Sequence, residues 1–172
     1  MKRILETPRL LMREMDQDDY GDLCTLLQDR AVMYAYEHDF TPQDVQDWLD
    51  RQLTRYERYG FGLWALILKE TGEFIGQAGL TMQDAAGEEV LEIGYLLKHA
   101  FWHLGYATEA TQACKEYAFQ VLKASKVCCL IKADNIASQK VAKAMGMKKV
   151  KELKKTYYNG EMLHFLYEVK QK

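Results

Sequence analysis

The stretch from Leu91 to Ala113, LEIGYLLKHAFWHLGYATEATQA, constrains the fold of this chain more than any other. Its first part, Leu91 to Leu97, is rich in β-branched, aromatic and aliphatic residues and is short enough to be a strand. Its second part favours a helix, and Gly105 stands where the turn between the two must tighten. The unpaired backbone N–H groups and the dipole of such a helix start form an anion site, and phosphate has a suitable size. The stretch therefore predicts a phosphate-binding turn, although many crossovers with one glycine bind nothing.

The composition of the 172 residues predicts one soluble domain over residues 1–172. Apolar residues make up 48% of the chain, which is enough for a sizeable core. Apolar runs fall short of the roughly 20 residues that cross a bilayer, and the charged segment 1–12 predicts no secretory signal. The formal net charge of −2 gives no basic excess for direct nucleic-acid binding. We therefore expect a cytoplasmic protein that has neither a membrane nor a nucleic acid as its partner.

The four cysteines are predicted to be small buried residues in a reducing cytosol. Cys24, Cys114, Cys128 and Cys129 contain no C-x-x-C pair and lack metal-ligand spacing with the four histidines. Adjacent Cys128 and Cys129 should point to opposite faces of one strand. We therefore expect no metal site.

Capping signals predict about four helices. Asp16-x-x-Asp19 is expected to cap a helix that ends near residue 29. Thr41-Pro42-Gln43-Asp44 marks the start of a second helix, which continues to about residue 56. The third helix follows Gly105 and reaches about residue 123, and the fourth spans about 136–145 and ends at Gly146.

Strands are expected over residues 9–13, 61–69, 73–82, 91–97 and 127–133, with a final hairpin around Asn159-Gly160. A helical crossover makes strands 91–97 and 127–133 parallel. The prediction is an α+β fold with a mixed, mostly antiparallel twisted sheet and one central parallel pair. The lysine-rich segment 148–155 is interpreted as a solvated strand edge, in preference to a basic binding patch.

Six motifs occur in a specific order and spacing. They are Glu6-Thr7-Pro8-Arg9-Leu10-Leu11-Met12-Arg13, Ile75-Gly76-Gln77-Ala78-Gly79-Leu80, Glu92-Ile93-Gly94-Tyr95, Trp102 to Ala110, Asn135-x-x-Ser138 and Met145-Gly146-Met147. Together they resemble the GNAT superfamily of acyl-CoA-dependent N-acyltransferases, over nearly the whole chain. Within it they look most like the ribosomal-protein N-acetyltransferase (RimJ/RimL-type) branch. The resemblance implies that strands 92–97 and 127–133 splay apart.

The family's phosphate loop, Arg/Gln-x-x-Gly-x-Gly/Ala, falls on Trp102 to Ala107. Gly105 and Ala107 fit the pattern and Trp102 suits the branch, whereas His103 stands where the branch usually has a second glycine and tolerates fewer backbone angles. The resemblance implies acetyl-CoA as co-substrate, with its phosphates on this loop and its pantetheine arm along the splayed strand. The cofactor-binding residues that it implies are Tyr95, Leu96, Leu97, Trp102, His103, Leu104, Gly105, Tyr106, Ala107, Thr108, Asn135 and Ser138.

Acetyl transfer to an amine needs a base for the amine and an acid for the departing thiolate. Glu92 is the candidate base, because the family places a glutamate here and a carboxylate in an apolar strand is expensive to bury unused. Glu92 could instead point outward or pair with a lysine. Ser138 is the family-matched acid, with Asn135 holding it, although both would also suit ordinary helix capping. Tyr167 is an alternative acid, and a backbone N–H near Leu96 would polarise the carbonyl.

The acceptor amine is left open by the sequence. The branch resemblance favours a protein N-terminal α-amine, which loses its proton far more easily than a lysine. A small amine such as an amino acid, polyamine or antibiotic is the alternative, as is a non-catalytic acyl-CoA-binding module. The family implies that Tyr34, Tyr36, Glu37 and His38 contact the substrate, unless they are core or covering residues. Relatives that pair through sheet edges make a homodimer one arrangement to test.

Overall fold

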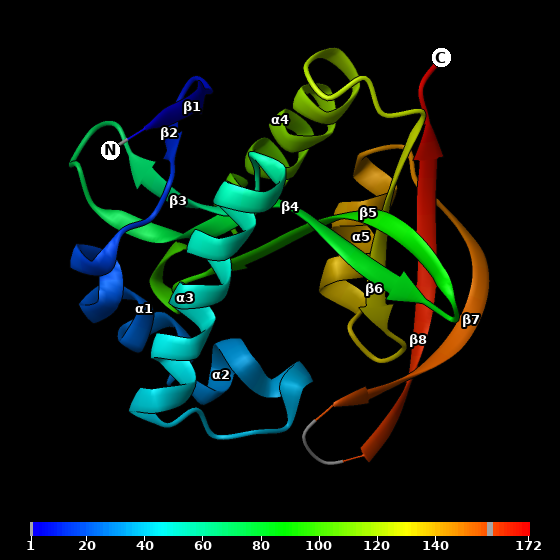
Figure 1. Cartoon of the computed structure of the whole chain (residues 1–172), viewed down its shortest axis with the longest axis horizontal. Helices are drawn as coiled ribbons and strands as arrows, with labels where there is room; N and C mark the ends of the chain where they lie inside the picture. The colour runs from blue at the N-terminus through cyan, green and yellow to red at the C-terminus, as the bar shows by residue number, and fades with distance from the viewer. Residues whose placement is uncertain (1, 158–159) are drawn as a thin grey trace.

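The computed structural model describes residues 2–157 and 160–172, which form one eight-stranded sheet covered by helices (Figure 1). The strands are β1 (Arg3–Glu6), β2 (Leu10–Arg13), β3 (Leu63–Leu68), β4 (Phe74–Ala85), β5 (Glu88–Leu97), β6 (Lys126–Lys132), β7 (Lys148–Tyr157) and β8 (Gly160–Lys170). The α-helices in this part of the chain are α1 (Tyr20–Leu27), α2 (Arg30–Met33), α3 (Pro42–Tyr59), α4 (Tyr106–Gln120) and α5 (Ile136–Ala144). Short 3₁₀ turns are η1 (Gln17–Asp19), η2 (Tyr34–Tyr36) and η3 (His99–Phe101).

The strand order is β1-β2-β3-β4-β5-β6-β8-β7, and every neighbouring pair is antiparallel except β5 and β6. This confirms the predicted α+β sheet with one parallel pair. Strands β4 and β5 are in register at ten positions, whereas β5 and β6 share a single register pair, Glu92 with Cys128. The rest of the facing edges of β5 and β6 therefore lacks the continuous ladder that joins other neighbours.

Helices cover both faces of the sheet, so its central strands are apolar on both sides. On one face, α1, α2 and α3 pack on a core that includes Leu63 and Ala65. On the other, α4 and α5 pack on a core that includes Trp64 and Leu66. The alternation along β3 assigns its successive residues to opposite cores. Figure 1 shows α3 in front of the sheet, beside β4 and β5.

Capping boxes are present at both predicted helix starts: the one at Asp16 opens the 3₁₀ turn η1, which leads into α1, and the one at Thr41 opens α3. Two elements were not predicted. Strand β1 precedes the expected first strand, and α2 is an additional short helix capped by Asp29. Gly79 lies in the motif that runs from Ile75 to Leu80. This position has to be glycine, because a Cβ there would lie 2.0 Å from the carbonyl oxygen of Gly62.

The lysine-rich segment lies in β7 at the edge of the sheet, as interpreted from the sequence. The turn of the predicted C-terminal hairpin, residues 158–159, lies outside the described residues, and β7 and β8 on either side are antiparallel. The four cysteines are unpaired, and three of them, Cys114, Cys128 and Cys129, are buried. None of the helices in the described ranges has the length and apolarity needed to cross a membrane.

Candidate active site

Glu92 lies at the single point where β5 and β6 pair. Its Oε2 accepts a hydrogen bond of 2.7 Å from the backbone N–H of Leu130 on β6. One residue along, the thiol of Cys129 donates to the carbonyl oxygen of Ile93 at 3.3 Å. Side chains thus satisfy backbone groups that a continuous ladder would pair, and this holds the two strands together where their own pairing stops.

Burial raises the pKa of Glu92 from 4.5 to about 7. The hydrogen bond from Leu130 and the positive charges of Lys155 and Arg55 act in the opposite direction. A carboxyl group with this pKa is about half ionised at neutral pH. It can therefore take a proton from a bound group and return it near physiological pH.

Beyond Glu92, the edge of β5 that faces β6 is partly open. Because the carbonyl of Ile93 faces β6, backbone alternation directs Tyr95 and Leu97 to the same edge and Leu96 toward β4. The carbonyl of Leu97 accepts a hydrogen bond of 2.9 Å from Trp102 Nε1. Tyr95 has no register partner on β6, so this edge offers its backbone groups, together with the N–H of Leu97, to a ligand.

The start of α5 brings Ser138 to the side chain of Tyr95. Asn135 is the N-cap, and its side-chain oxygen accepts from the backbone N–H of Ser138. The hydroxyl groups of Ser138 and Tyr95 lie 3.2 Å apart. Tyr167 is placed differently, because it is buried and its hydroxyl donates to Gln139 Oε1 at 2.9 Å. Ser138 and Asn135 are therefore brought together with Tyr95, whereas the Tyr167 hydroxyl is directed at Gln139.

The loop before α4 has two residues in the left-handed region. Gly105, the N-cap, has φ +85° and His103 has φ +62°. That conformation suits glycine, and it is uncommon and mildly strained for histidine. No side chain caps the helix, so the first-turn N–H groups of Tyr106, Ala107 and Thr108 are without an intrahelical acceptor and open to an anion.

Arg9 and Glu109 support this loop from outside it. Arg9 Nη1 donates to the carbonyl of Leu104 at 2.9 Å, and its guanidinium lies 4.2 Å from the ring centre of Tyr106. Glu109 accepts hydrogen bonds from the Arg9 backbone, from Arg9 Nε and from the Thr7 hydroxyl. The family-like Thr7-Pro8-Arg9 motif was a sequence signal for this contact, but its role in bracing the loop was not inferred from sequence.

The four residues expected to contact the substrate lie around η2. Tyr34 is 48% exposed, whereas Tyr36 packs edge-on against Phe40 and Trp48. Glu37 lies 3.6 Å from the Nζ of Lys132, and His38 Nε2 lies 2.9 Å from Asp44 Oδ2 in the capping box of α3. Tyr34 is thus open to a ligand, while Tyr36 and His38 have clear packing and capping roles.

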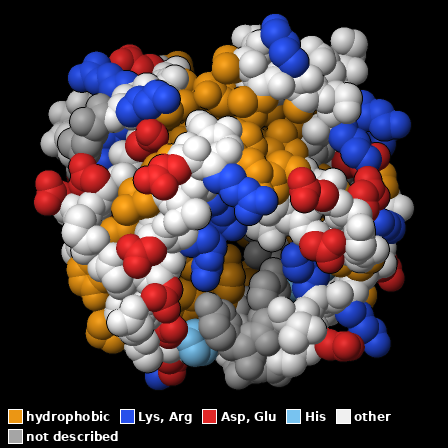
Figure 2. All heavy atoms as spheres, in the orientation of Figure 1, with side chains coloured by type: hydrophobic (Ala, Val, Ile, Leu, Met, Phe, Trp, Pro, Cys, Tyr) orange, Lys and Arg blue, Asp and Glu red, His pale blue; other side chains and the backbone are white. Residues whose placement is uncertain are grey.

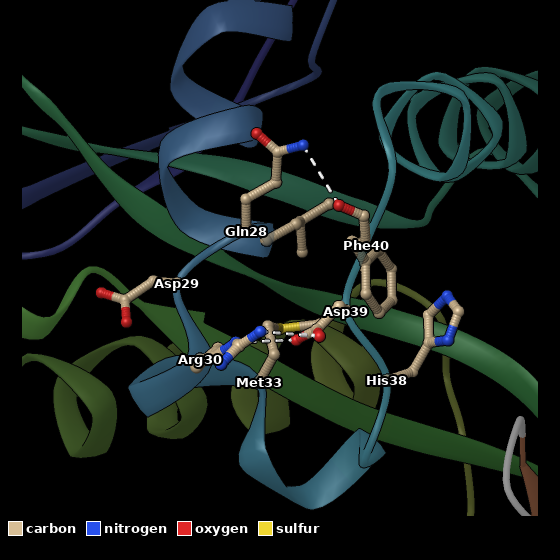
Figure 3. A pocket seen from close by; sticks show the side chains of 8 residues that line it. Gln28, Asp29, Arg30, Met33, His38, Asp39 and Phe40 are labelled. Atoms are coloured by element: carbon tan, nitrogen blue, oxygen red, sulfur yellow. Dashed lines mark hydrogen bonds and ion pairs between the residues drawn. The ribbon is translucent and has the colours of Figure 1, made fainter.

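A cavity of about 210 Å³ lies between α2 and the segment that leads to α3 (Figure 3). Across it, Arg30 makes two hydrogen bonds to Asp39, with Met33 beside the pair. These charges satisfy each other and Glu92 does not line the cavity, so we assign it no role in the chemistry. Within residues 2–157 and 160–172, no three His, Cys, Asp or Glu side chains are grouped as metal ligands.

Comparison with protein families decides what this arrangement of open strand edge, loop and half-buried glutamate represents. Residues 9–148 match the family model described as an acetyltransferase (GNAT) domain. The chain belongs to the GNAT family of acetyltransferases. Among its relatives, the uncharacterized protein YkkB of Bacillus subtilis (strain 168) is 36% identical over 155 residues, which cover 90% of both chains. The uncharacterized N-acetyltransferase YnaD of the same strain is 28% identical over 91% of this chain and 89% of its own.

Solved structures confirm the GNAT fold. A GNAT-family acetyltransferase from Bacillus anthracis superposes with a TM-score of 0.81 at 22% identity, covering 96% of this chain and 97% of that one. RimL, a ribosomal alpha-N-protein acetyltransferase in complex with coenzyme A, gives 0.80 at 15% identity over 98% of each chain. A spermidine N-acetyltransferase from Vibrio cholerae, in complex with CoA and spermine, gives 0.76 at 14% identity over 95% and 96%. The acceptors named for these neighbours differ, so the fold of this N-acetyltransferase leaves the amine open.

Proposed function

We propose that this N-acetyltransferase transfers the acetyl group of acetyl-CoA to the α-amine of a protein N-terminus, as in the RimJ/RimL-type branch. The observation that carries the proposal is the position of Glu92, a half-buried carboxyl with a pKa of about 7 beside the open edge of β5. The resemblance of the motifs to the RimJ/RimL-type branch gives it further support.

The residues present suit acetyl-CoA. The uncapped start of α4 offers backbone N–H groups to phosphate, and Arg9 places a guanidinium beside the loop. Tyr95 offers backbone hydrogen bonds to an extended amide-containing arm. When bound, acetyl-CoA supplies a thioester carbonyl for attack by the amine.

The pKa of Glu92 favours an α-amine over a lysine amine. A proton moves from an α-amine of pKa 7.7–8.0 to a carboxylate of pKa about 7 at a cost of about 1 kcal/mol. The same transfer from a lysine amine of pKa about 10.4 costs about 5 kcal/mol. Glu92, directly or through a water molecule, is therefore a competent base for an N-terminal amine and a weak one for lysine.

Direct transfer in a ternary complex is favoured by the state of the nearby thiols. Burial, together with the charge of Glu92, raises the pKa of both Cys128 and Cys129. Thiols in this state are poor nucleophiles, and Cys129 already donates to Ile93. We assign the proton for the departing thiolate to the paired hydroxyl groups of Ser138 and Tyr95. Tyr167, the other candidate acid, is proposed to position α5 through Gln139.

The test is incubation of the protein with acetyl-CoA and a pool of three acceptor sets, followed by mass spectrometry of the products. The sets are peptides with a free N-terminus and no lysine, the same peptides N-terminally blocked with one lysine added, and small amines. We expect mass gain on free N-termini with matching release of thiol. Acetylation confined to small amines or to lysine would overturn the proposed acceptor.

A further inference from the structure

Two cationic side chains act electrostatically on the proposed base. Arg55 on α3 and Lys155 on β7 are the charged side chains that act on the carboxyl of Glu92, and Arg51 acts on Arg55 one turn away along α3. Figure 2 shows Lys and Arg side chains gathered at the middle of the face that α3 occupies, beside a hollow. Ile93, the next residue on β5, packs in the core on the α4 and α5 side, so alternation puts the Glu92 side chain on the face of the sheet that α3 covers.

These cations have no carboxylate partner among the described residues. Arg55 donates one hydrogen bond, to Gln52 Oε1 at 3.0 Å, and Lys155 donates one to the carbonyl of Asp84 at 3.4 Å. Neither Arg51, Arg55 nor Lys155 lies within 4.0 Å of a carboxylate in the described part of the chain. Most other buried or half-buried cations here do have one, as Arg13 does with Asp19 at 2.9 Å.

Arg55 is the informative member of the group, because it is partly buried. Burial, and then the charge of Arg51, lowers its pKa, so the folded protein holds this guanidinium at a cost in free energy. A guanidinium presents up to five N–H donors, and Arg55 uses one of them in the described structure. The remaining donors match the two oxygens of a carboxylate.

We infer that the acceptor carries a carboxylate close to its amine, and that Arg55, aided by Lys155 and Arg51, binds this carboxylate while Glu92 faces the amine. The inference rests on the proposed function for the identity of Glu92 as the base. An N-terminal peptide with an acidic residue next to its first residue has this chemistry, and so does a free amino acid. A polyamine lacks it, because each of its charges would be repelled by Arg55 and Lys155.

The test compares three peptides that share the same first residue and differ in the next two, which are glutamate, glutamine or lysine. Free glutamate and spermidine are assayed beside them, each as the varied acceptor at saturating acetyl-CoA. We expect kcat/KM for the acidic peptide to exceed that for the neutral one by about tenfold, the value of a charge-assisted hydrogen bond, with the lysine peptide lower still.

The decisive variant is Arg55→Gln, with Arg58→Gln as the matched control. Arg58 lies on the same helix, is exposed and stacks on Tyr59. Arg55→Gln is expected to remove most of the acidic preference, and Arg58→Gln to keep it. The readout is kcat/KM for the acidic peptide divided by kcat/KM for the neutral one, because any change that the variant makes in the pKa of Glu92 affects both peptides equally. Thermal melting and the KM for acetyl-CoA establish that each variant is folded.

The outcomes separate the carboxylate inference from the proposed N-terminal acceptor. Equal or better rates for the neutral or lysine peptide overturn the acidic acceptor and leave the N-terminal acceptor standing, whereas a better rate for spermidine than for every peptide overturns both. Product with free glutamate alone supports the carboxylate inference and overturns the protein N-terminus. An equal loss of activity toward all three peptides in Arg55→Gln overturns the assignment of Arg55. No product with any acidic acceptor overturns the inference.

Discussion

The carboxylate of Glu92 accepts a hydrogen bond from the backbone N–H of Leu130 across the only register pair of β5 and β6. This bond makes the glutamate part of the sheet as well as part of the proposed site. It occupies one oxygen, Oε2, and leaves Oε1 without a hydrogen-bond partner in the described structure. A single side chain thus fixes where the strands meet and presents a basic oxygen beside the open edge of β5.

Glu92→Gln tests this oxygen as the base. We expect kcat to fall by about 10²–10⁴-fold, since general-base catalysis contributes rate factors of that size. The KM for acetyl-CoA should stay within about twofold, because the loop and α4 supply the phosphate contacts. In the wild type, kcat should rise with pH through about 7 as Glu92 ionises, and this limb should be missing from the variant. The control is Glu89→Gln, because Glu89 is an exposed glutamate on the same strand. An unchanged kcat in Glu92→Gln would remove Glu92 from the mechanism.

The same variant has a separate effect on stability. Glu92 has a folded pKa of about 7 against an ordinary value of 4.5, so the folded protein binds this proton more tightly than the unfolded chain. Wild-type stability should therefore fall as the pH rises from about 4.5 to about 7 and then level off. Glu92→Gln lacks this penalty and should be more stable by about 3 kcal/mol at pH 8, with the gain disappearing near pH 4.5. Urea unfolding at both pH values measures it, and a gain independent of pH would contradict the assigned burial cost.

Local signals predicted the elements that frame the site. The capping boxes at Asp16 and Thr41 formed because they depend on residues three positions apart, which the sequence displays directly. Strand β1, in contrast, has only four residues, with exposed charged residues at both ends, and it is a strand because β2 pairs with it. Its pattern carries no signal of its own, so only the tertiary partner could reveal it.

The candidate site was predictable as single residues but not as a constellation. Glu92 and Gly105 were found from one polar residue in an apolar strand and one glycine before a helix. Leu130, which donates to Glu92, and Arg55, whose charge lowers the pKa of Glu92, come from other elements, and no periodicity connects them to it. The same holds for the hydroxyl pair of Tyr95 and Ser138, because strand β5 and helix α5 meet only in the folded chain.

The loop before α4 allows a paired test of backbone conformation. Gly105→Ala puts a Cβ on a residue with φ +85°, where Arg9 Nη2 would be 3.3 Å away, and should lower stability by about 1 kcal/mol. It should also raise the KM for acetyl-CoA, because strain in the loop would rotate its backbone N–H groups away from the phosphates. His103→Gly relieves a φ of +62° but makes the unfolded chain more flexible, so stability should change by less than about 1 kcal/mol. Equal KM values for Gly105→Ala and the wild type would refute the loop assignment.

Glu109→Gln tests whether the N-terminal segment braces the loop. Burial alone would raise the pKa of Glu109, but the hydrogen bonds from Thr7 and Arg9 outweigh it and hold the pKa below 4.5. A lowered acid pKa stabilises the fold above the unfolded value, and this contribution is lost as the pH falls through the folded value. Glu109→Gln should therefore lower stability by about 1–2 kcal/mol at pH 7, with the difference closing below about pH 4.5.

The same change should weaken cofactor binding, because Arg9 then loses the carboxylate that orients it toward Leu104. Denaturant unfolding across pH and the KM for acetyl-CoA are the two measurements. Glu116→Gln, an exposed glutamate on the same helix, is the control and should change neither. A loss of stability in Glu109→Gln with an unchanged KM would mean that Arg9 and Glu109 hold the N-terminal segment in place without shaping the loop.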